Sequence, residues 1–238
     1  EKQLTQDTIK TFYSWIQRLI KNEPLQYITG TIEFYGLGLM ITPAVFIPRP
    51  ETERVVDIAL QILKTVISPK ILDVGTGSGI PGLLIKILNP ETNIHLLDSN
   101  KKKVEFLRKV VSELDITDIQ ILHSRAEKEG RNPVFREVFD VVVSRGVAKL
   151  NQLAELTIPF CKLQGLVICL KGNNIDQELK SSEFASKILG AENVDVISAE
   201  YQENQLPDKL IVWEKTKLTP LKFPRRDGVP KKSPLIKN

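Results

Sequence analysis

The stretch that decides the fold is Ile71-Leu-Asp-Val-Gly-Thr-Gly-Ser-Gly79, which reads ILDVGTGSG. Its apolar beginning predicts a buried strand, and its glycines predict a turn whose backbone can approach a ligand closely. Pro81 then marks the start of a helix, because a proline in the first helical turn lacks only an N–H that would have no partner there. This order of strand, glycine-rich turn and helix predicts the first unit of an α/β sheet.

The rest of the chain repeats the alternation of strand and helix. Apolar runs predict strands at residues 70–74, 93–97, 119–122, 138–143, 165–171, 194–199 and 209–214. Apolar residues at helical spacing predict helices at 53–67, 81–88, 101–114, 150–159 and 175–188. The alternation predicts an α/β fold with a Rossmann-like, doubly wound, seven-stranded and mainly parallel sheet.

The segment before residue 53 departs from this pattern. Residues 5–21 predict an amphipathic helix, and residues 24–50 predict a β-hairpin, because β-rich runs alternate there with Gly and Pro. We therefore expect an N-terminal helix and hairpin at 1–52, a core at 53–215 and a basic C-terminal arm at 216–238.

The composition of the 238 residues, 42% hydrophobic and 26% charged, is typical of a globular protein. The only two cysteines, Cys161 and Cys169, lie in apolar stretches and are interpreted as small buried hydrophobes. Two histidines are too few for a metal cluster. No signal peptide is visible, and no apolar run reaches the roughly 18 residues that span a bilayer. We expect a cytoplasmic protein without a metal or a membrane partner.

The charge is concentrated at one end of the chain. Eight basic residues and one acid follow from Lys215 onward, so this tail carries a net charge of +7. Because the whole chain carries +4, the rest carries −3. The tail is either a solvated basic segment or an arm that contacts phosphates, and the clustering of its cations among prolines favours the arm.

The glycine-rich turn indicates which ligand it holds. Its glycines fall at 75, 77 and 79, and Ile80 stands where a dinucleotide-binding pattern has its third glycine. Asp73 would repel a pyrophosphate and suits a cationic ligand instead. Asp98 ends the next strand, 23 residues after Gly75, where an acid can accept both hydroxyls of a ribose.

These features resemble motif I of class I S-adenosylmethionine-dependent methyltransferases, an acid followed by G-x-G-x-G. The resemblance implies S-adenosyl-L-methionine as the cofactor, with its methionine part near Asp73, its ribose on Asp98 and its adenine near Glu127. The cofactor-binding candidates are Asp73, Gly75, Thr76, Gly77, Asp98, Ser99, Ala126, Glu127 and Arg145.

Residues 24–53, PLQYITGTIEFYGLGLMITPAVFIPRPETE, closely resemble the N-terminal hairpin and linker of the HemK/PrmC family. Those enzymes methylate a glutamine side chain of release factors and carry Asn-Pro-Pro-Tyr at the end of their fourth strand. A carboxamide nitrogen is a poor nucleophile because its lone pair is delocalised, and that motif aligns it for attack. Here Val143-Ser144-Arg145-Gly146 stands in its place, so the residues for that chemistry are missing.

From motif I onward the chain resembles the RsmG (GidB) family, whose members methylate N7 of a guanine in small-subunit (16S) ribosomal RNA. The resemblance covers most of residues 70–172 and then 223–235. That family usually has Ser-Arg-Ala where this chain has Ser144-Arg145-Gly146. The stretches that carry the resemblance are ILDVGTGSGIPGLLI, LLDSNKKKVEFLRKVV, HSRAE, FDVVVSRGVAKL, LVICLKG and FPRRDGVPKKSPL.

Guanine N7 has an in-plane lone pair and no proton, so its methylation needs positioning rather than a general base. The catalytic candidates are Ser144 near the methyl group, Arg145 and Lys171, all at strand ends. We expect Arg145 to hold guanine O6 or a phosphate, because a contact with N7 itself would block the reaction. Alternatively, Arg145 pairs with an acid and closes a loop, and Lys171 only extends its charge to solvent.

The RNA partner implied by this resemblance is small-subunit ribosomal RNA or the 30S particle. The RNA-binding candidates are Arg125, Lys171, Arg225, Arg226, Lys231 and Lys232. Two other functions stay open: a HemK-like glutamine methyltransferase of release factors, and a non-catalytic RNA- or ribosome-binding module.

Overall fold

The computed structural model describes residues 5–64, 66–172, 175–199 and 208–236. The chain divides into two compact units, Glu1–Pro50 and Glu51–Asn238. Within the described ranges, no helix combines the length and the apolar character that crossing a membrane requires.

The first unit contains two helices and a hairpin. Helix α1 (Gln6–Ile20) begins at Thr5, whose hydroxyl accepts the backbone N–H of Thr8 at 3.2 Å. The two-stranded hairpin is confirmed and consists of β1 (Thr31–Phe34) and β2 (Leu37–Met40). Helix α2 (Leu25–Thr29) was not predicted, because five residues are too few to show a helical period.

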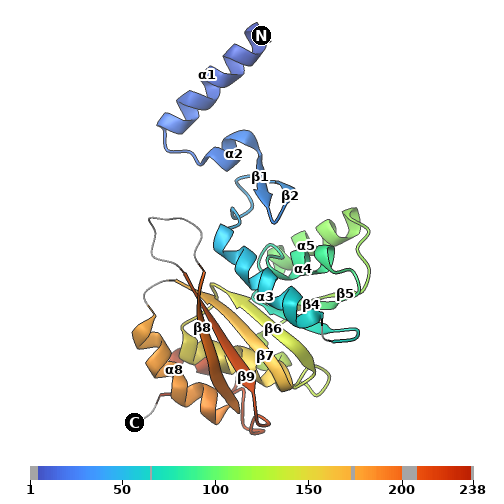
Figure 1. Cartoon of the computed structure of the whole chain (residues 1–238), viewed down its shortest axis with the longest axis vertical. Helices are drawn as coiled ribbons and strands as arrows, with labels where there is room; N and C mark the ends of the chain where they lie inside the picture. Colours follow the sequence, from blue (N-terminus) through green and yellow to red (C-terminus); the bar gives the residue numbers. More distant parts are fainter. Residues whose placement is uncertain (1–4, 65, 173–174, 200–207, 237–238) are drawn as a thin grey trace. The chain divides into compact units, whose positions relative to one another are not determined.

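The second unit is built on a seven-stranded sheet of order β5-β4-β3-β6-β7-β9-β8 (Figure 1). Strand β9 runs antiparallel to both of its neighbours, and the other pairs are parallel, so the predicted seven-stranded and mainly parallel sheet is confirmed. The strands are β3 (Lys70–Val74), β4 (Asn93–Asp98), β5 (Ile119–His123), β6 (Phe139–Arg145), β7 (Cys161–Lys171), β8 (Ala191–Ala199) and β9 (Asp208–Lys215).

Helices cover both faces of this sheet, with α3, α4 and α5 on one face and α7 and α8 on the other (Figure 1). The four-residue helices α6 and α9 were not predicted, again because they are too short to show a period. The bounds are η1 (Pro50–Thr52), α3 (Glu53–Leu63), α4 (Gly82–Leu88), α5 (Lys101–Glu113), α6 (Ala126–Glu129), α7 (Leu150–Thr157), η2 (Ile158–Phe160), α8 (Asp176–Ile188) and α9 (Val229–Lys232).

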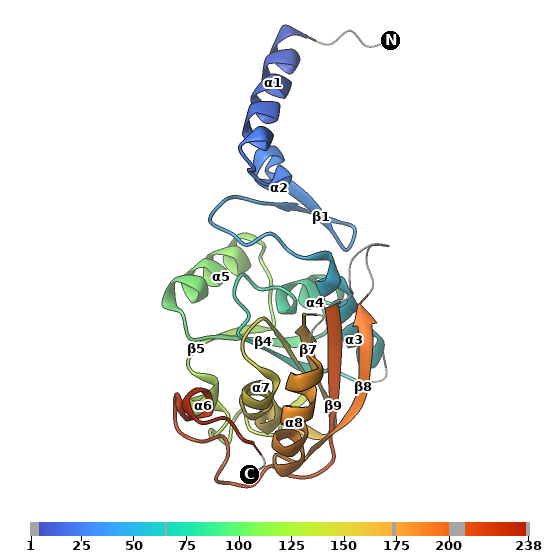
Figure 2. The same ribbon diagram turned by 90° about the vertical axis from the view of Figure 1, so that its left-hand side faces the viewer.

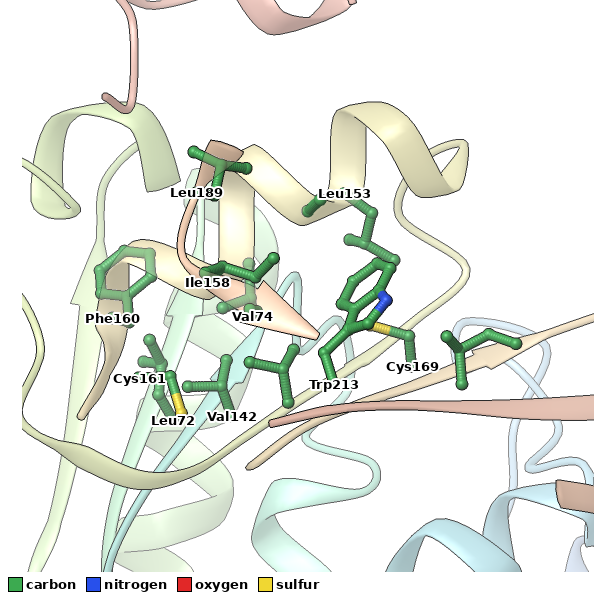
Figure 3. Close-up of a cluster of buried hydrophobic side chains, with 14 of the residues drawn as sticks. Leu72, Val74, Val142, Leu153, Ile158, Phe160, Cys161, Cys169, Leu189 and Trp213 are labelled. Carbon is green, nitrogen blue, oxygen red and sulfur yellow. The ribbon is translucent and has the colours of Figure 1, made fainter. Parts of the chain in front are cut away.

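A cluster of buried hydrophobic side chains lies between the sheet and the α7–α8 layer (Figure 3). Trp213 of β9 is 1% exposed and packs in this cluster with Leu153 of α7. Fully burying a leucine side chain such as that of Leu153 contributes about 1.5–3 kcal/mol. Cys161 and Cys169 belong to the same cluster as free thiols, and burial raises the pKa of each to about 12. Both therefore act as buried hydrophobes, as predicted.

Charged side chains hold the segment after β9 against the rest of the second unit. Lys215 is fully buried, donates from Nζ to the carbonyl of Ile158 at 3.1 Å and pairs with Glu137 at 3.1 Å. Burial lowers the pKa of Lys215, and the Glu137 carboxylate opposes that shift. Arg136 then donates to the carbonyl oxygen of Phe223 at 2.7 Å. The C-terminal arm is thus packed on the core at its start rather than solvated along its whole length.

Candidate cofactor and substrate site

The site lies at the carboxyl ends of the parallel strands, where an open α/β sheet binds its ligands. β3 ends before the glycine-rich turn, β4 ends at Asp98, β6 at Arg145 and β7 at Lys171. Because these strands are adjacent in the sheet, the predicted residues on them come together at one edge.

Asp73 lies under the glycine-rich turn and is 1% exposed. Its Oδ2 accepts the Thr76 hydroxyl at 2.7 Å and the Gly82 N–H at 3.0 Å, while its Oδ1 is buried without a hydrogen bond from the described residues. Burial raises the pKa of Asp73 to about 6, and these two hydrogen bonds together with the charge of Arg145 limit the rise. A buried acceptor that lacks a donor fits a cationic ligand group, such as the ammonium of S-adenosylmethionine.

Asp98 is oriented by the same turn. Its Oδ2 accepts the N–H of Gly77 at 3.0 Å and its Oδ1 accepts the N–H of Asn100 at 2.8 Å. The cap of helix α5 is Asn100, so Asp98 is not needed for that purpose and can face a ribose. Ser99 next to it is exposed at the same strand end.

The loop of residues 146–149, between β6 and α7, covers the glycine-rich turn. A Cβ built on Gly75 would lie 2.4 Å from Cγ2 of Val147, and Gly75 has a φ of +72°, so only glycine fits there. Gly146 begins this loop with a φ of +65°. The sequence did not predict that Val147 covers the turn. The signal for it was Gly146, which replaces the alanine of the family pattern Ser-Arg-Ala and gives the loop its own backbone conformation.

Glu127 of α6 is 3% exposed at the end of β5. Its Oε1 accepts the N–H of Gly228 at 2.9 Å and Nη2 of Arg125 at 3.0 Å. Burial by itself would raise the pKa of Glu127, but these hydrogen bonds lower it below its usual range. Glu127 is thus an ionised acceptor beside the half-buried Ala126, as an adenine amino group requires.

The two residues that end β6 have different environments. Ser144 has no exposed surface, and its hydroxyl donates to the carbonyl of Val74 at 3.0 Å. The Ser144 hydroxyl therefore joins the carboxyl ends of β6 and β3, and its predicted place near the methyl group stays a prediction. Arg145 is partly exposed and donates from Nη1 to the hydroxyl of Thr52 at 2.8 Å.

Lys171 holds a loop rather than extending into solvent. Its Nζ donates to the carbonyl of Ala148 at 2.9 Å and pairs with Glu178 at 2.8 Å, and its side chain is 15% exposed. Glu178 also accepts the N–H of Leu150 at the start of α7. Because this ammonium is already engaged, we interpret Lys171 as a positioning residue and remove it from the RNA contacts and the catalytic residues.

The basic candidates of the arm also divide into two groups. Arg225 points inward, where its guanidinium forms a bidentate pair with Glu155, a side chain without exposed surface. It anchors the arm, and we remove Arg225 from the RNA contacts. Arg125 is exposed although it is paired with Glu127. The remaining candidates, Arg226, Lys231 and Lys232, are exposed.

The described ranges contain no group of three His, Cys, Asp or Glu side chains that could hold a metal ion.

Comparison with protein families gives two matches in one chain. The model of rRNA small subunit methyltransferase G matches residues 51–207, and the model of the PrmC N-terminal domain matches residues 1–30. These are the two resemblances expected from the sequence, although the second match ends before the hairpin.

Known relatives and solved structures agree with the larger match. Ribosomal RNA small subunit methyltransferase G of Clostridium novyi is 41% identical over 167 residues, covering 70% of this chain and 69% of the relative. The protein of the same name from Clostridium tetani is 43% identical over 166 residues, 70% of each chain.

In fold, the chain is similar to M. jannaschii TYW2 in complex with AdoMet, with a TM-score of 0.56 and 13% identity over 78% of this chain and 85% of that one. It is similarly related to the ribosomal protein L11 methylase of Lactobacillus delbrueckii subsp. bulgaricus, with a TM-score of 0.54 and 15% identity over 74% and 84% of the two chains. Because its family model covers most of the sheet and its relatives align over more than two thirds of their length, the chain belongs to the rRNA small subunit methyltransferase G (GidB) family of S-adenosylmethionine-dependent methyltransferases.

Proposed function

We propose that this protein transfers the methyl group of S-adenosylmethionine to N7 of a guanine in small-subunit ribosomal RNA, in the cytoplasm. The observation that carries the proposal is Arg145, a partly exposed cation at the carboxyl end of β6 beside the glycine-rich turn. The chain has Ser144-Arg145 where a glutamine methyltransferase has Asn-Pro-Pro-Tyr.

The residues that hold the cofactor in this proposal are three carboxylates on adjacent strand ends. Asp73 offers its unpaired Oδ1 to the cationic methionine part, Asp98 accepts the ribose hydroxyls, and Glu127 accepts the adenine amino group. Gly75 and Gly77 allow the backbone to approach the cofactor, and Val147 covers the turn. This set fixes the direction in which the methyl group points.

The protein then has to align the acceptor atom and tolerate the positive charge that forms on the guanine ring. S-adenosylmethionine would supply the methyl group: the N7 lone pair would form the bond to the methyl carbon, and the electrons of the broken carbon–sulfur bond would stay on the sulfur of S-adenosylhomocysteine. Alignment of this kind can lower a barrier by about 7–11 kcal/mol in favourable cases. Arg145 holds guanine O6 or an adjacent phosphate and leaves N7 open to the methyl group.

Exposed cations supply the RNA contacts in this proposal. Arg226, Lys231 and Lys232 lie on the described part of the C-terminal arm, and Arg125 lies beside the site. Each phosphate that such a cation neutralises releases counterions, so binding should weaken steeply as salt is raised.

The experiment is methyl transfer from labelled S-adenosylmethionine to 30S particles and to naked 16S RNA, followed by mapping of the modified base. We expect one 7-methylguanine in the small-subunit RNA. A release factor serves as the competing substrate, because residues 1–30 match the PrmC N-terminal domain. Methylation of the release factor together with unmodified RNA would reverse the assignment.

A further inference from the structure

A buried ion pair between Arg225 and Glu155 anchors the C-terminal arm to helix α7. The backbone N–H of Arg225 donates to Glu155 Oε1 at 2.7 Å, and the Arg225 guanidinium contacts both oxygens of the same carboxylate. Glu155 is on α7 and has no exposed surface. A charge-assisted bidentate pair of this kind fixes the direction of the chain at that point.

Beyond this anchor the arm runs over α6. In Figure 2 the red helix near the end of the chain overlaps α6, and two contacts show that the arm lies beside it. Asp227 pairs with Arg131 just after α6 at 3.3 Å. Pro224 lies so close to Gly130 that a Cβ on that glycine would be 2.8 Å from its Cγ. The arm and α6 therefore fit together without room for a larger residue.

The arm reaches the candidate cofactor site at Gly228. This glycine has a φ of +77°, a left-handed conformation that points its N–H at Oε1 of Glu127, 2.9 Å away. Arg125 donates to the same oxygen. In the part of the chain that the structure describes, both of these hydrogen bonds end on Oε1, so Gly228 and Arg125 hold the carboxylate through the same oxygen.

We propose that the C-terminal arm completes the cofactor site, with Gly228 as a positioning residue that orients Glu127 toward the adenine amino group. This inference rests on the proposed function, because it takes Glu127 as the adenine contact. Gly228 acts only through Glu127. The arm that carries the exposed RNA-contact candidates Arg226, Lys231 and Lys232 is thereby also part of the wall of the cofactor site.

The test measures how well the protein recognises the adenine amino group. S-adenosylhomocysteine and its analogue with unsubstituted purine, which lacks only the 6-amino group, are titrated into the full-length protein by calorimetry. A hydrogen bond to a charged acceptor predicts that the wild type prefers adenine on the order of tenfold to a hundredfold. Loss of this preference reports on the direction of Glu127, whereas a general loss of stability weakens both ligands equally.

Two changes disturb the arm in different ways. Gly228→Ala adds a methyl group that meets no atom within 4 Å, so its effect comes from the left-handed backbone alone. Glu155→Leu combined with Arg225→Met replaces the buried ion pair with apolar side chains of similar size, which folded proteins commonly tolerate. We expect the adenine preference to fall to within about threefold of unity in both variants.

The controls match each change. Gly36→Ala alters a glycine with a φ of +72° and the same open surroundings, but in the hairpin of the first unit, and should keep the wild-type preference. Arg226→Ala removes the neighbouring exposed cation of the arm and should weaken RNA binding without changing the preference.

The outcomes separate the inference from the proposed function. If Glu127→Met, which removes the acceptor, loses the adenine preference while both arm variants keep it, the role of the arm is refuted and the adenine contact stands. If Glu127→Met keeps the preference, the assignment of Glu127 is refuted and the inference with it. A wild-type protein that binds neither ligand would overturn the proposed function itself.

Discussion

The hydroxyl of Thr52 accepts a hydrogen bond from Nη1 of Arg145 at 2.8 Å, and Thr52 has no exposed surface. Thr52 ends the short helix η1, and Arg145 ends strand β6. Although 93 positions separate them in the chain, both lie within residues 51–207, which match the methyltransferase G family model.

The first prediction concerns Arg145 itself. Arg145→Ala should lower the single-turnover rate of methyl transfer to 30S particles by about tenfold to a hundredfold, the range for loss of one hydrogen bond from a charged donor. The dissociation constant of S-adenosylhomocysteine, measured by calorimetry, should change by less than about threefold. A large loss of cofactor affinity with an unchanged transfer rate would assign Arg145 to the cofactor instead.

The second prediction tests Thr52 as a positioning residue. Thr52→Val keeps the shape but removes the acceptor from the Arg145 guanidinium, so the transfer rate should fall roughly fivefold to twentyfold. Thr52→Ser keeps the hydroxyl and should restore most of that rate. If Val and Ser variants have equal rates, the hydrogen bond does not position Arg145. Thermal unfolding of both variants checks that the fold is intact.

The third prediction follows from the pKa of about 6 that burial gives Asp73. The cationic cofactor needs the ionised carboxylate, so the affinity for S-adenosylmethionine should fall below pH 6, by up to about tenfold per pH unit. The free energy of unfolding without ligand changes with pH in the direction opposite to the cofactor affinity. Because folding raises the pKa of Asp73 from 3.8, the stabilisation linked to its protonation is present below about pH 4 and is lost as the pH rises through 6.

Asp73→Asn is the matched control for this prediction. The amide retains an acceptor for Thr76 and Gly82 but cannot ionise, so binding should be weak and nearly independent of pH between 5 and 8. Titration of S-adenosylmethionine at four or five pH values gives both curves. A wild-type affinity that stays constant across this range would show that Asp73 does not face the cationic group.

The fourth prediction separates loop positioning from RNA contact at Lys171. Lys171→Met removes the partner of Glu178 and the donor to Ala148, so the loop of residues 146–149 loses its support and cofactor affinity should fall several-fold. The salt dependence of RNA binding should stay that of the wild type. Lys232→Ala, an exposed cation of the arm, should instead reduce the slope of that dependence by about one unit. A reduced slope in Lys171→Met would restore Lys171 as an RNA contact.

The sequence alone determined the sheet and the strand ends at which the cofactor-binding candidates lie. All seven strands were predicted, because a buried parallel strand appears as a short apolar run between turn signals whatever its neighbours are. Asp73, the glycines and Asp98 were located for a similar reason, since the carboxyl end of each strand defines the ligand side of the sheet. The chemistry of these positions is local in the chain.

Only the tertiary structure decided what the charged and hydroxyl side chains contact. Lys171, Arg225 and Ser144 were chosen from the sequence for their chemistry, and only the fold shows that each has a partner within the chain. Glu155 lies 70 positions from Arg225, and Gly228 lies 101 positions from Glu127. Buried charges need partners, and the fold supplies those partners from distant segments that no local pattern reveals.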